Sequence, residues 1–330
     1  MKMIELVERL PAQIAEALEI GRNATFNKHT TAIRNVFISG LGGSGIGANF
    51  TSEFVRDELK VPLAVSKGYD IPKWVSKNTL AIVSSYSGNT EETLSAFEML
   101  LKTGAKIVCI ASGGKVIAKA KELGLDYIQL PNNWPSPRAC IGFSVVSQLT
   151  VLNKLKLISA KTIKQMEGVA KFLEKEQPKL RTLGEKLAQD LHGKTPVIYT
   201  TDRMESVAVR FRQQVNENSK CLCWHHVIPE MNHNELVGWR EKNDTLAVVY
   251  FRNNDDFSRN AMRININKGI IGEYTPNIIE LWSKGRNTLE KAFYFVFLGD
   301  FASCFLCDLR GFDSIEIKVI DFLKSELGKV

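Results

Sequence analysis

The sequence lacks both a long hydrophobic run and a secretory leader. No stretch approaches the roughly 18 consecutive apolar residues that a membrane-spanning helix needs. Residues 1–8 (MKMIELVE) form an amphipathic pattern with acids, without the apolar core of a signal peptide. We therefore expect a cytoplasmic protein, no membrane partner, and six cysteines that remain reduced thiols.

A concentrated basic surface is also missing. Lys and Arg number 43 against 36 acids, for a formal net charge of +7, but the basic residues are scattered among the acids. Because no basic stripe with interleaved aromatic residues occurs, we expect no nucleic-acid partner. A mildly positive field suits an anionic small-molecule substrate.

Zinc-type cysteine spacing is incomplete. The residues that invite a metal interpretation are Cys221, Cys223, His225, His226, Cys304 and Cys307. Cys304 and Cys307 form a CxxC, but they lie one turn apart in an apolar helical pattern, and the others alternate as in a strand. Since no second CxxC follows, we interpret the thiols as small buried hydrophobes and expect no metal site.

The pattern of the first half predicts a parallel sheet. The 330 residues are long for one core and favour two domains. Strands are expected at 35–39, 62–66, 79–83, 106–110 and 126–129, and helices at 45–58, 90–103, 114–122 and 139–156. Alternating strands and helices indicate a sheet that helices cover on both faces.

A similar alternation follows an amphipathic segment at 161–189. Strands are expected at 197–200, 222–227, 245–251 and 271–275, and helices at 205–219, 287–309 and 316–328. No low-complexity linker separates the halves. The predicted fold class is α/β, with two similar domains over 1–156 and 157–330.

Residues 40–45 (GLGGSG) directly follow an apolar run and match the dinucleotide fingerprint G-x-G-x-x-G. That fingerprint also requires an acid at the end of the second strand, to bind the ribose. Here the strand runs into Lys67 and Gly68, and Asp70 lies past them. A nicotinamide site and a merely structural tight turn both stay open on these glycines alone.

A second loop, residues 85–90 (SYSGNT), disfavours both of those interpretations. It also lies between a predicted buried strand and a helix. Hydroxyl groups and free N–H groups at a helix N-terminus favour an anion. Two such loops on neighbouring parallel strands can close around one phosphate.

With these loops, the chain resembles the sugar isomerase (SIS) domain family, whose members hold sugar phosphates with such serine and threonine loops. The resemblance covers essentially the whole chain, and is strongest to the two-domain phosphoglucose/phosphomannose isomerases. The segments that carry it are 42–45, 85–92, 137–138, 216–220 and 232–235. It implies two SIS-type domains, each a parallel sheet with helices on both faces.

The resemblance also implies roles for individual residues. The phosphate would be held by Gly43, Ser44, Ser85, Ser87 and Thr90. Glu217 would move a proton between C2 and C1 of the sugar, His233 would open the ring, and Arg138 would lie near the enediolate. Lys324, from the last helix, would complete the site. The resemblance implies no metal or organic cofactor. It does imply a homodimer with active sites near the subunit interface.

The residues by themselves leave alternatives open. Glu217 could be a surface acid, and His233 a capping histidine with His225 and His226 as competitors. Arg138 could pair with an acid at the domain boundary, and Lys318 or Lys329 could replace Lys324.

Function also has alternatives at this level. Residues 313–315 read DSI where the family pattern favours Asp-Pro-Thr, so a threonine connected with the mannose epimer is missing. The balance of glucose and mannose activities therefore stays open. An isomerase of another sugar phosphate is one rival. A SIS sensor without turnover is another, although it would not need Glu217 and His233 and usually carries a DNA-binding helix-turn-helix.

Overall fold

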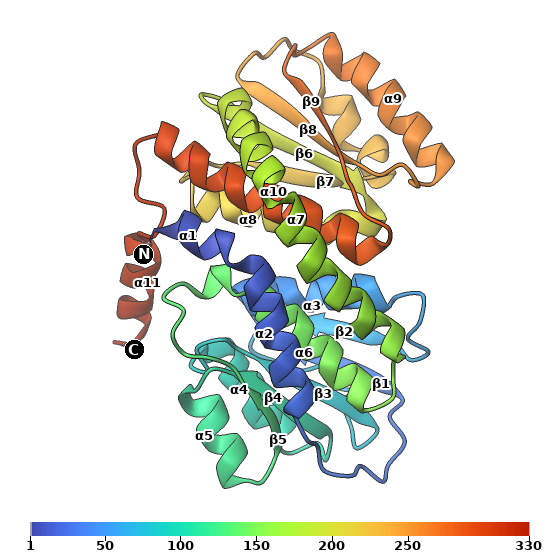
Figure 1. Cartoon of the computed structure of the whole chain (residues 1–330), viewed down its shortest axis with the longest axis vertical. Coiled ribbons are helices and arrows are strands. Elements are labelled where there is room, and N and C mark those ends of the chain that lie inside the picture. Colours follow the sequence, from blue (N-terminus) through green and yellow to red (C-terminus); the bar gives the residue numbers. More distant parts are fainter. Residues whose placement is uncertain (1, 330) are drawn as a thin grey trace. The chain divides into compact units, whose positions relative to one another are not determined.

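The chain folds into two compact α/β units. The computed structural model describes residues 2–329 (Figure 1). The N-terminal unit comprises Arg9–Glu174 and Asn287–Glu290. The C-terminal unit comprises the segment that ends at Glu8, Lys175–Arg286 and the segment from Lys291 onward. The α/β class with two parallel sheets is confirmed, whereas the boundary after residue 156 stays a prediction because α7 (Ala160–Leu191) contributes to both units.

The N-terminal unit contains a five-stranded parallel sheet in the order β2-β1-β3-β4-β5. The strands are β1 (Asn35–Ser39), β2 (Leu63–Ser66), β3 (Thr79–Ser84), β4 (Lys106–Ala111) and β5 (Asp126–Gln129). The helices are α2 (Leu10–Asn23), α3 (Gly42–Val55), α4 (Glu91–Leu100), α5 (Gly114–Glu122) and α6 (Ile141–Lys154). The five strands agree with the predicted positions to within one residue at each end.

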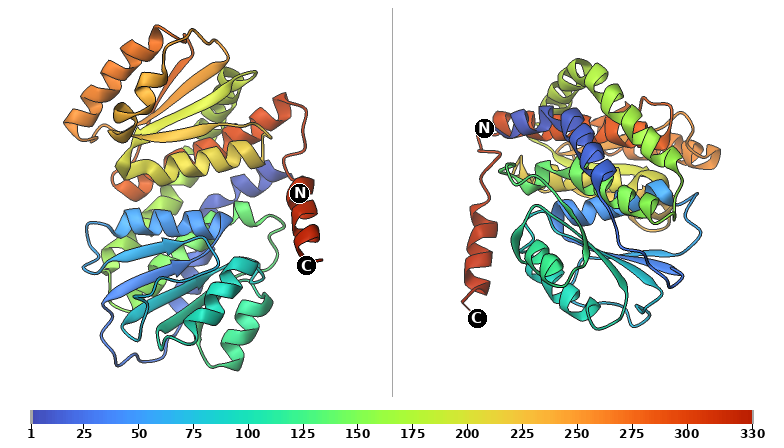
Figure 2. Two further views of the ribbon diagram at one scale, coloured as in Figure 1. Left: turned by 180° about the vertical axis from the view of Figure 1, so that it is seen from behind. Right: turned by 60° about the horizontal axis from the view of Figure 1, so that its bottom comes forward.

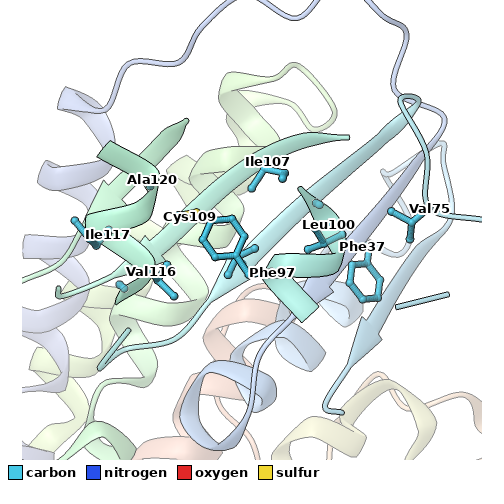
Figure 3. Close-up of a cluster of buried hydrophobic side chains, with 12 residues drawn as sticks. Phe37, Val75, Phe97, Leu100, Ile107, Cys109, Val116, Ile117 and Ala120 are labelled. Atoms are coloured by element: carbon cyan, nitrogen blue, oxygen red, sulfur yellow. The ribbon is translucent and has the colours of Figure 1, made fainter. Parts of the chain in front are cut away.

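One face of this sheet packs against α4 and α5 (Figure 3). Alternate strand residues such as Val83 and Cys109 contact Phe97 of α4 and Val116 of α5 in one cluster. The intervening residues, such as Ile82, are fully buried as well. Burial on both faces explains the nearly continuous apolar runs from which these strands were predicted.

The C-terminal unit contains a four-stranded parallel sheet in the order β7-β6-β8-β9. The strands are β6 (Thr195–Thr201), β7 (Trp224–Ile228), β8 (Leu246–Arg252) and β9 (Ile278–Trp282). The helices are α1 (Met3–Glu8), α8 (Glu205–Glu217), α9 (Ser258–Gly272), α10 (Thr288–Leu309, mostly in this unit) and α11 (Lys318–Leu327). Short 3₁₀ helices include η3 (Glu230–His233) and η4 (Glu235–Gly238).

The strand expected at 271–275 is wrong. Those residues end α9 and form the turn after it, and the last strand begins at Ile278. Ile264 and Ile271 are buried on the same helix, seven residues apart, which is two helical turns. The adjacent apolar pair at 270–271 resembles a strand only when the seven-residue spacing of Ile264 and Ile271 is ignored.

Helix α10 is, within the described part of the chain, the one helix long and apolar enough to cross a membrane by length and composition. However, 83% of its most apolar window is buried inside the protein. Phe295 of α10 packs on Phe251 of β8 with ring centroids 4.7 Å apart, and Phe251 packs in turn on Phe211 of α8. The composition of α10 is therefore that of a core helix.

Candidate functional site

The two predicted phosphate loops follow neighbouring strands, β1 and β3. From this pair the sheet extends to β2 on one side and to β4 and β5 on the other, so the strand order reverses between β1 and β3. In open α/β sheets, ligands bind at the carboxyl ends of the strands where the order reverses. The loops therefore lie at the position in this unit that best suits a ligand.

The glycine loop after β1 is held tightly against the end of β3. A Cβ atom added to Gly40 would lie 2.8 Å from the carbonyl oxygen of Ser84, and one on Gly45 would lie 2.5 Å from that of Gly40. Helix α3 begins at Gly42, where φ is +50°, and no side chain caps its N-terminus. The first N–H groups of α3 thus lack a side-chain cap, as anion binding requires.

The loop after β3 gathers hydroxyl groups. The Oγ of Ser85 and the Oγ1 of Thr90 lie 2.9 Å apart, and the N–H of Gly88 donates to Ser85 Oγ at 3.2 Å. Ser85 is buried, whereas Ser87 is exposed and its Oγ accepts from the N–H of Asn89 at 3.2 Å. Hydroxyls at different depths on one turn can contact different oxygens of one phosphate.

Buried polar contacts join the two loops. The side-chain amide of Gln148, on α6, lies 3.4 Å from the carbonyl oxygen of Ser44 and 3.3 Å from Ser84 Oγ. Gln148 is fully buried. It therefore fixes the start of α3 relative to the end of β3, beneath the loops.

Arg138 lies beside the glycine loop. It belongs to a 3₁₀ turn, Pro137–Ala139, and is 6% exposed. A Cβ atom added to Gly43 would lie 3.1 Å from the carbonyl oxygen of Pro137 and 3.8 Å from the Cα of Arg138. All predicted site residues of the N-terminal unit thus lie at the same end of the sheet, on the loop after β3, on the first turn of α3 or on the 3₁₀ turn. Their role as ligands stays a prediction.

Sequence reasoning missed Lys67, which follows β2. Its Cε lies 3.3 Å from the position of a Cβ atom on Gly45. In the sequence, Lys67 shows only that the strand lacks the acid that a dinucleotide site requires at its end. The parallel pairing of β1 with β2 brings it to the same sheet edge as the glycine loop. Only the strand order reveals this second cation near the loop.

The C-terminal unit carries the three other predicted residues on three different elements. Glu217 is the last residue of α8 and is half-buried. His233 ends η3 and is exposed, and Lys324 is exposed on α11. Their convergence on one substrate stays a prediction.

The segment around His233 is anchored on both sides. On one side, Asn232 Nδ2 donates to Asn267 Oδ1 on α9 at 2.7 Å. On the other, Glu235 Oε1 accepts from the hydroxyl of Tyr199 and, at 3.0 Å, from Trp224 Nε1. The exposed imidazole of His233 therefore extends from a backbone whose neighbours are fixed.

His225 and His226 lie in β7, where successive side chains point to opposite faces. Burial, with smaller contributions from Arg212 and His226, lowers the pKa of His225 to about 4. His225 is thus neutral near pH 7. His226 Nδ1 accepts from the N–H of Val227 at 2.8 Å.

The cysteines behave as apolar side chains. Cys304 and Cys307 are buried in α10, and burial raises the pKa of both thiols. Burial also raises the pKa of Cys223 to about 12. Across residues 2–329, no three His, Cys, Asp or Glu side chains are grouped so that they could hold a metal ion.

Comparisons with known proteins place the chain in a family. Residues 181–327 match the model of the bacterial phospho-glucose isomerase C-terminal SIS domain. Two solved structures share the fold at low identity. The C-terminal domain of glucosamine-fructose-6-phosphate aminotransferase from Francisella tularensis has a TM-score of 0.78 at 15% identity, with 94% of this chain and 97% of that chain covered. Tagatose-6-phosphate ketose/aldose isomerase from Escherichia coli has a TM-score of 0.70 at 13% identity, with 96% and 95% covered.

Two curated relatives are similar over most of their length. The chain is 37% identical over 338 residues to the bifunctional phosphoglucose/phosphomannose isomerase of Caldicellulosiruptor bescii, with 99% of each chain covered. It is 34% identical over 305 residues to the bifunctional phosphoglucose/phosphomannose isomerase of Aquifex aeolicus, with 92% of this chain and 93% of that one covered. This chain therefore belongs to the family of bifunctional phosphoglucose/phosphomannose isomerases.

Proposed function

We propose that this protein is an aldose–ketose isomerase that interconverts glucose 6-phosphate, mannose 6-phosphate or both with fructose 6-phosphate through a cis-enediol. The observation that carries this proposal is a match along nearly the full length of the chain. The alignment with the bifunctional phosphoglucose/phosphomannose isomerase of Caldicellulosiruptor bescii covers 99% of this chain. The hydroxyl groups of the loop at 85–90, which lies where the strand order reverses, support a phosphorylated substrate.

In this proposal the N-terminal unit holds the phosphate. Its ligands are the N–H of Gly43 and the hydroxyls of Ser44, Ser85, Ser87 and Thr90. The phosphate lies several bonds from the reacting carbons, so these contacts bind the ground state and the transition state alike. They should therefore set KM more than kcat.

Glu217 performs the proton transfer. Its carboxylate removes the proton from C2 of the open-chain aldose, while the C1 carbonyl oxygen gains electron density as the enediolate forms. The same proton then returns to C1, the proton of the O2 hydroxyl passes to O1, and C2 becomes the ketone carbonyl while C1 carries a hydroxyl. The guanidinium of Arg138, charged at any working pH, stabilises the developing negative charge.

His233 opens the sugar ring before this step. It donates a proton to the ring oxygen and accepts the one from O1, which suits an imidazole because its ordinary pKa lies near neutral pH. Lys324 completes the site. We further propose a cytoplasmic homodimer with active sites near the subunit interface, and a reaction that needs no metal or organic cofactor.

The deciding experiment compares Glu217→Gln with His233→Ala. Fructose 6-phosphate is supplied, and glucose 6-phosphate and mannose 6-phosphate are measured separately. Exchange of the substrate C–H proton with deuterated solvent is then followed on an acyclic analogue. Because a positioned base contributes about 10²–10⁴-fold in rate, Glu217→Gln should abolish turnover and exchange. His233→Ala should lose turnover of cyclic substrate but keep exchange on the acyclic one.

Glu205→Gln is the matched control, because Glu205 begins the same helix α8 that Glu217 ends. It should behave as wild type in both measurements. Exchange near the wild-type rate in Glu217→Gln would assign the base to another residue. Equal loss in both variants on the acyclic analogue would remove ring opening as the role of His233.

A further inference from the structure

Lys220 has a backbone conformation that lysine rarely adopts. Its φ is +54°, and Lys156 is the other non-glycine residue with positive φ between residues 2 and 329. Lys220 lies three residues after the end of α8, where a left-handed residue that ends a helix is usually glycine. Such a conformation persists only where surrounding contacts hold it.

The contacts of the Lys220 side chain supply such a constraint. Its ammonium donates to the carbonyl oxygen of Glu217 and to that of Glu316, each at 2.6 Å. The carbonyl oxygen of Lys220 itself accepts from Arg310 Nη2 at 3.2 Å. A cation at the C-terminus of α8 is also favoured by the helix dipole.

The residues between Glu217 and Lys220 are fixed to α10. Asn218 Nδ2 donates to Ser303 Oγ at 2.9 Å, and Ser219 Oγ donates to the carbonyl oxygen of Ser303 at 2.7 Å. All three side chains are fully buried. These contacts fix the end of α8, and with it the position of the Lys220 ammonium.

Helix α11, by contrast, has no buried residue along Lys318–Leu327. Figure 2 shows it set off from the sheet of the C-terminal unit by the preceding segment. Glu316 lies in that segment, two residues before the helix begins. The bond from Lys220 to Glu316 thus joins the base of α11, which carries Lys324, to the end of α8, which carries Glu217.

We propose that Lys220 is a positioning residue that fixes Glu217 and the base of α11 relative to each other, so that Glu217 and Lys324 reach the sugar together. Lys220 itself touches no substrate. This proposal rests on the proposed function, because it assigns Lys220 to the isomerase site. It predicts an effect on the chemical step and little effect on phosphate binding.

Three variants separate the ammonium from the backbone. Lys220→Met removes the ammonium and keeps the aliphatic stem, Lys220→Gly removes it and relieves the left-handed strain, and Lys220→Arg keeps a donor. Misplacement by about 1 Å can cost about 10²-fold in rate. We expect kcat for fructose 6-phosphate to fall about 10- to 100-fold in the Met and Gly variants, with KM within about threefold, and to recover in part in Lys220→Arg.

Lys156 provides the matched control. It also has positive φ, 60°, at the end of α6, but it lies in the N-terminal unit and is exposed. Lys156→Met and Lys156→Gly should keep the wild-type kcat. Since glycine suits the backbone at both positions, a loss of kcat confined to Lys220→Gly cannot be attributed to unfolding.

Amide hydrogen exchange of α11 tests the link without turnover. We expect the amides of residues 318–327 to exchange at least about tenfold faster in Lys220→Met than in wild type or Lys156→Met. Wild-type kcat in Lys220→Met, or a lower kcat with unchanged α11 exchange, would overturn the proposal. If wild type does not convert fructose 6-phosphate, the proposed function fails, whereas the exchange measurement still decides whether Lys220 fixes α11.

Discussion

At the residue scale, Gly88 shows how closely the hydroxyl loop packs against its neighbour. Its φ is +70°, and an added Cβ atom would lie 1.9 Å from the carbonyl oxygen of Gly113. Gly88→Ala must therefore displace the loop that carries Ser87. We expect a loss of about 3 kcal/mol in the free energy of unfolding and a KM for fructose 6-phosphate at least about tenfold higher.

Gly124→Ala is the control for that prediction. Gly124 also has positive φ, +62°, but an added Cβ atom would meet nothing within 4 Å. It should cost about 1 kcal/mol from backbone strain alone and leave KM unchanged. Urea denaturation and steady-state kinetics provide both measurements. Equal costs in the two variants would show that the contact with Gly113 is unimportant.

Also at the residue scale, His225 makes stability depend on pH. Burial lowers its pKa in the folded state to about 4, below the ordinary value of about 6.5 expected in the unfolded chain. The unfolded state therefore binds the proton more tightly. The stabilisation is complete above about pH 6.5 and is lost as the pH falls towards 4.

His225→Gln should remove this dependence. Because the side chain is partly accessible, we expect wild type to lose about 1–2 kcal/mol more than the variant between pH 7 and pH 4.5. Urea denaturation at the two pH values measures this difference. Parallel losses in both proteins would assign the acid sensitivity to other groups.

At the scale of elements, a buried ion pair joins α8 to α10. Arg210 Nη2 lies 2.7 Å from Asp300 Oδ2 and Nε lies 3.1 Å from Oδ1, with both residues less than 5% exposed. Removal of one partner leaves a buried charge without compensation. We expect Arg210→Met to lower the free energy of unfolding by about 3–5 kcal/mol.

The double variant Arg210→Met/Asp300→Leu should recover most of that loss, because it buries no charge. Asp300→Leu alone should be as destabilising as Arg210→Met. A double-mutant cycle from urea denaturation measures the coupling. Additive losses would mean that the pair is not what couples these two helices.

At the scale of the whole molecule, the proposed dimer predicts complementation between inactive variants. If each site combines Glu217 of one subunit with His233 of its partner, a heterodimer of Glu217→Gln and His233→Ala contains one intact site. Random reassociation makes half of the dimers heterodimers. The mixture should therefore regain about a quarter of wild-type activity, since the two sites are symmetric copies.

The measurement is turnover of fructose 6-phosphate after joint unfolding and refolding of the two variants, with each variant refolded alone as a control. Sedimentation of the refolded mixture establishes that dimers have formed. Activity no higher than that of the separate variants in a dimeric sample would place both residues in one subunit's site.

The strands and the two loops of the N-terminal unit could be predicted from the amino-acid sequence alone. Strands such as β3 are buried on both faces, so each appears as an unbroken apolar run, and loops such as 85–90 carry their chemistry in consecutive residues. Both signals are local. The alternation of strands and helices then determined the parallel sheet, because a parallel connection needs a crossover helix.

Contacts between residues that are distant in the sequence could be found only in the folded structure. Helix α9 was missed because apolar residues lie on both its sides: Ile264 is buried, whereas Ile266 is exposed, so the buried face that Ile264 and Ile271 share does not stand out in the sequence. Lys67 comes close to Gly45 only because β2 pairs with β1. Lys220 reaches Glu316 across 96 residues. Such pairings depend on which surfaces pack together. Because the hydrophobic effect is non-directional, a local sequence pattern shows that a surface is buried but not which surface covers it.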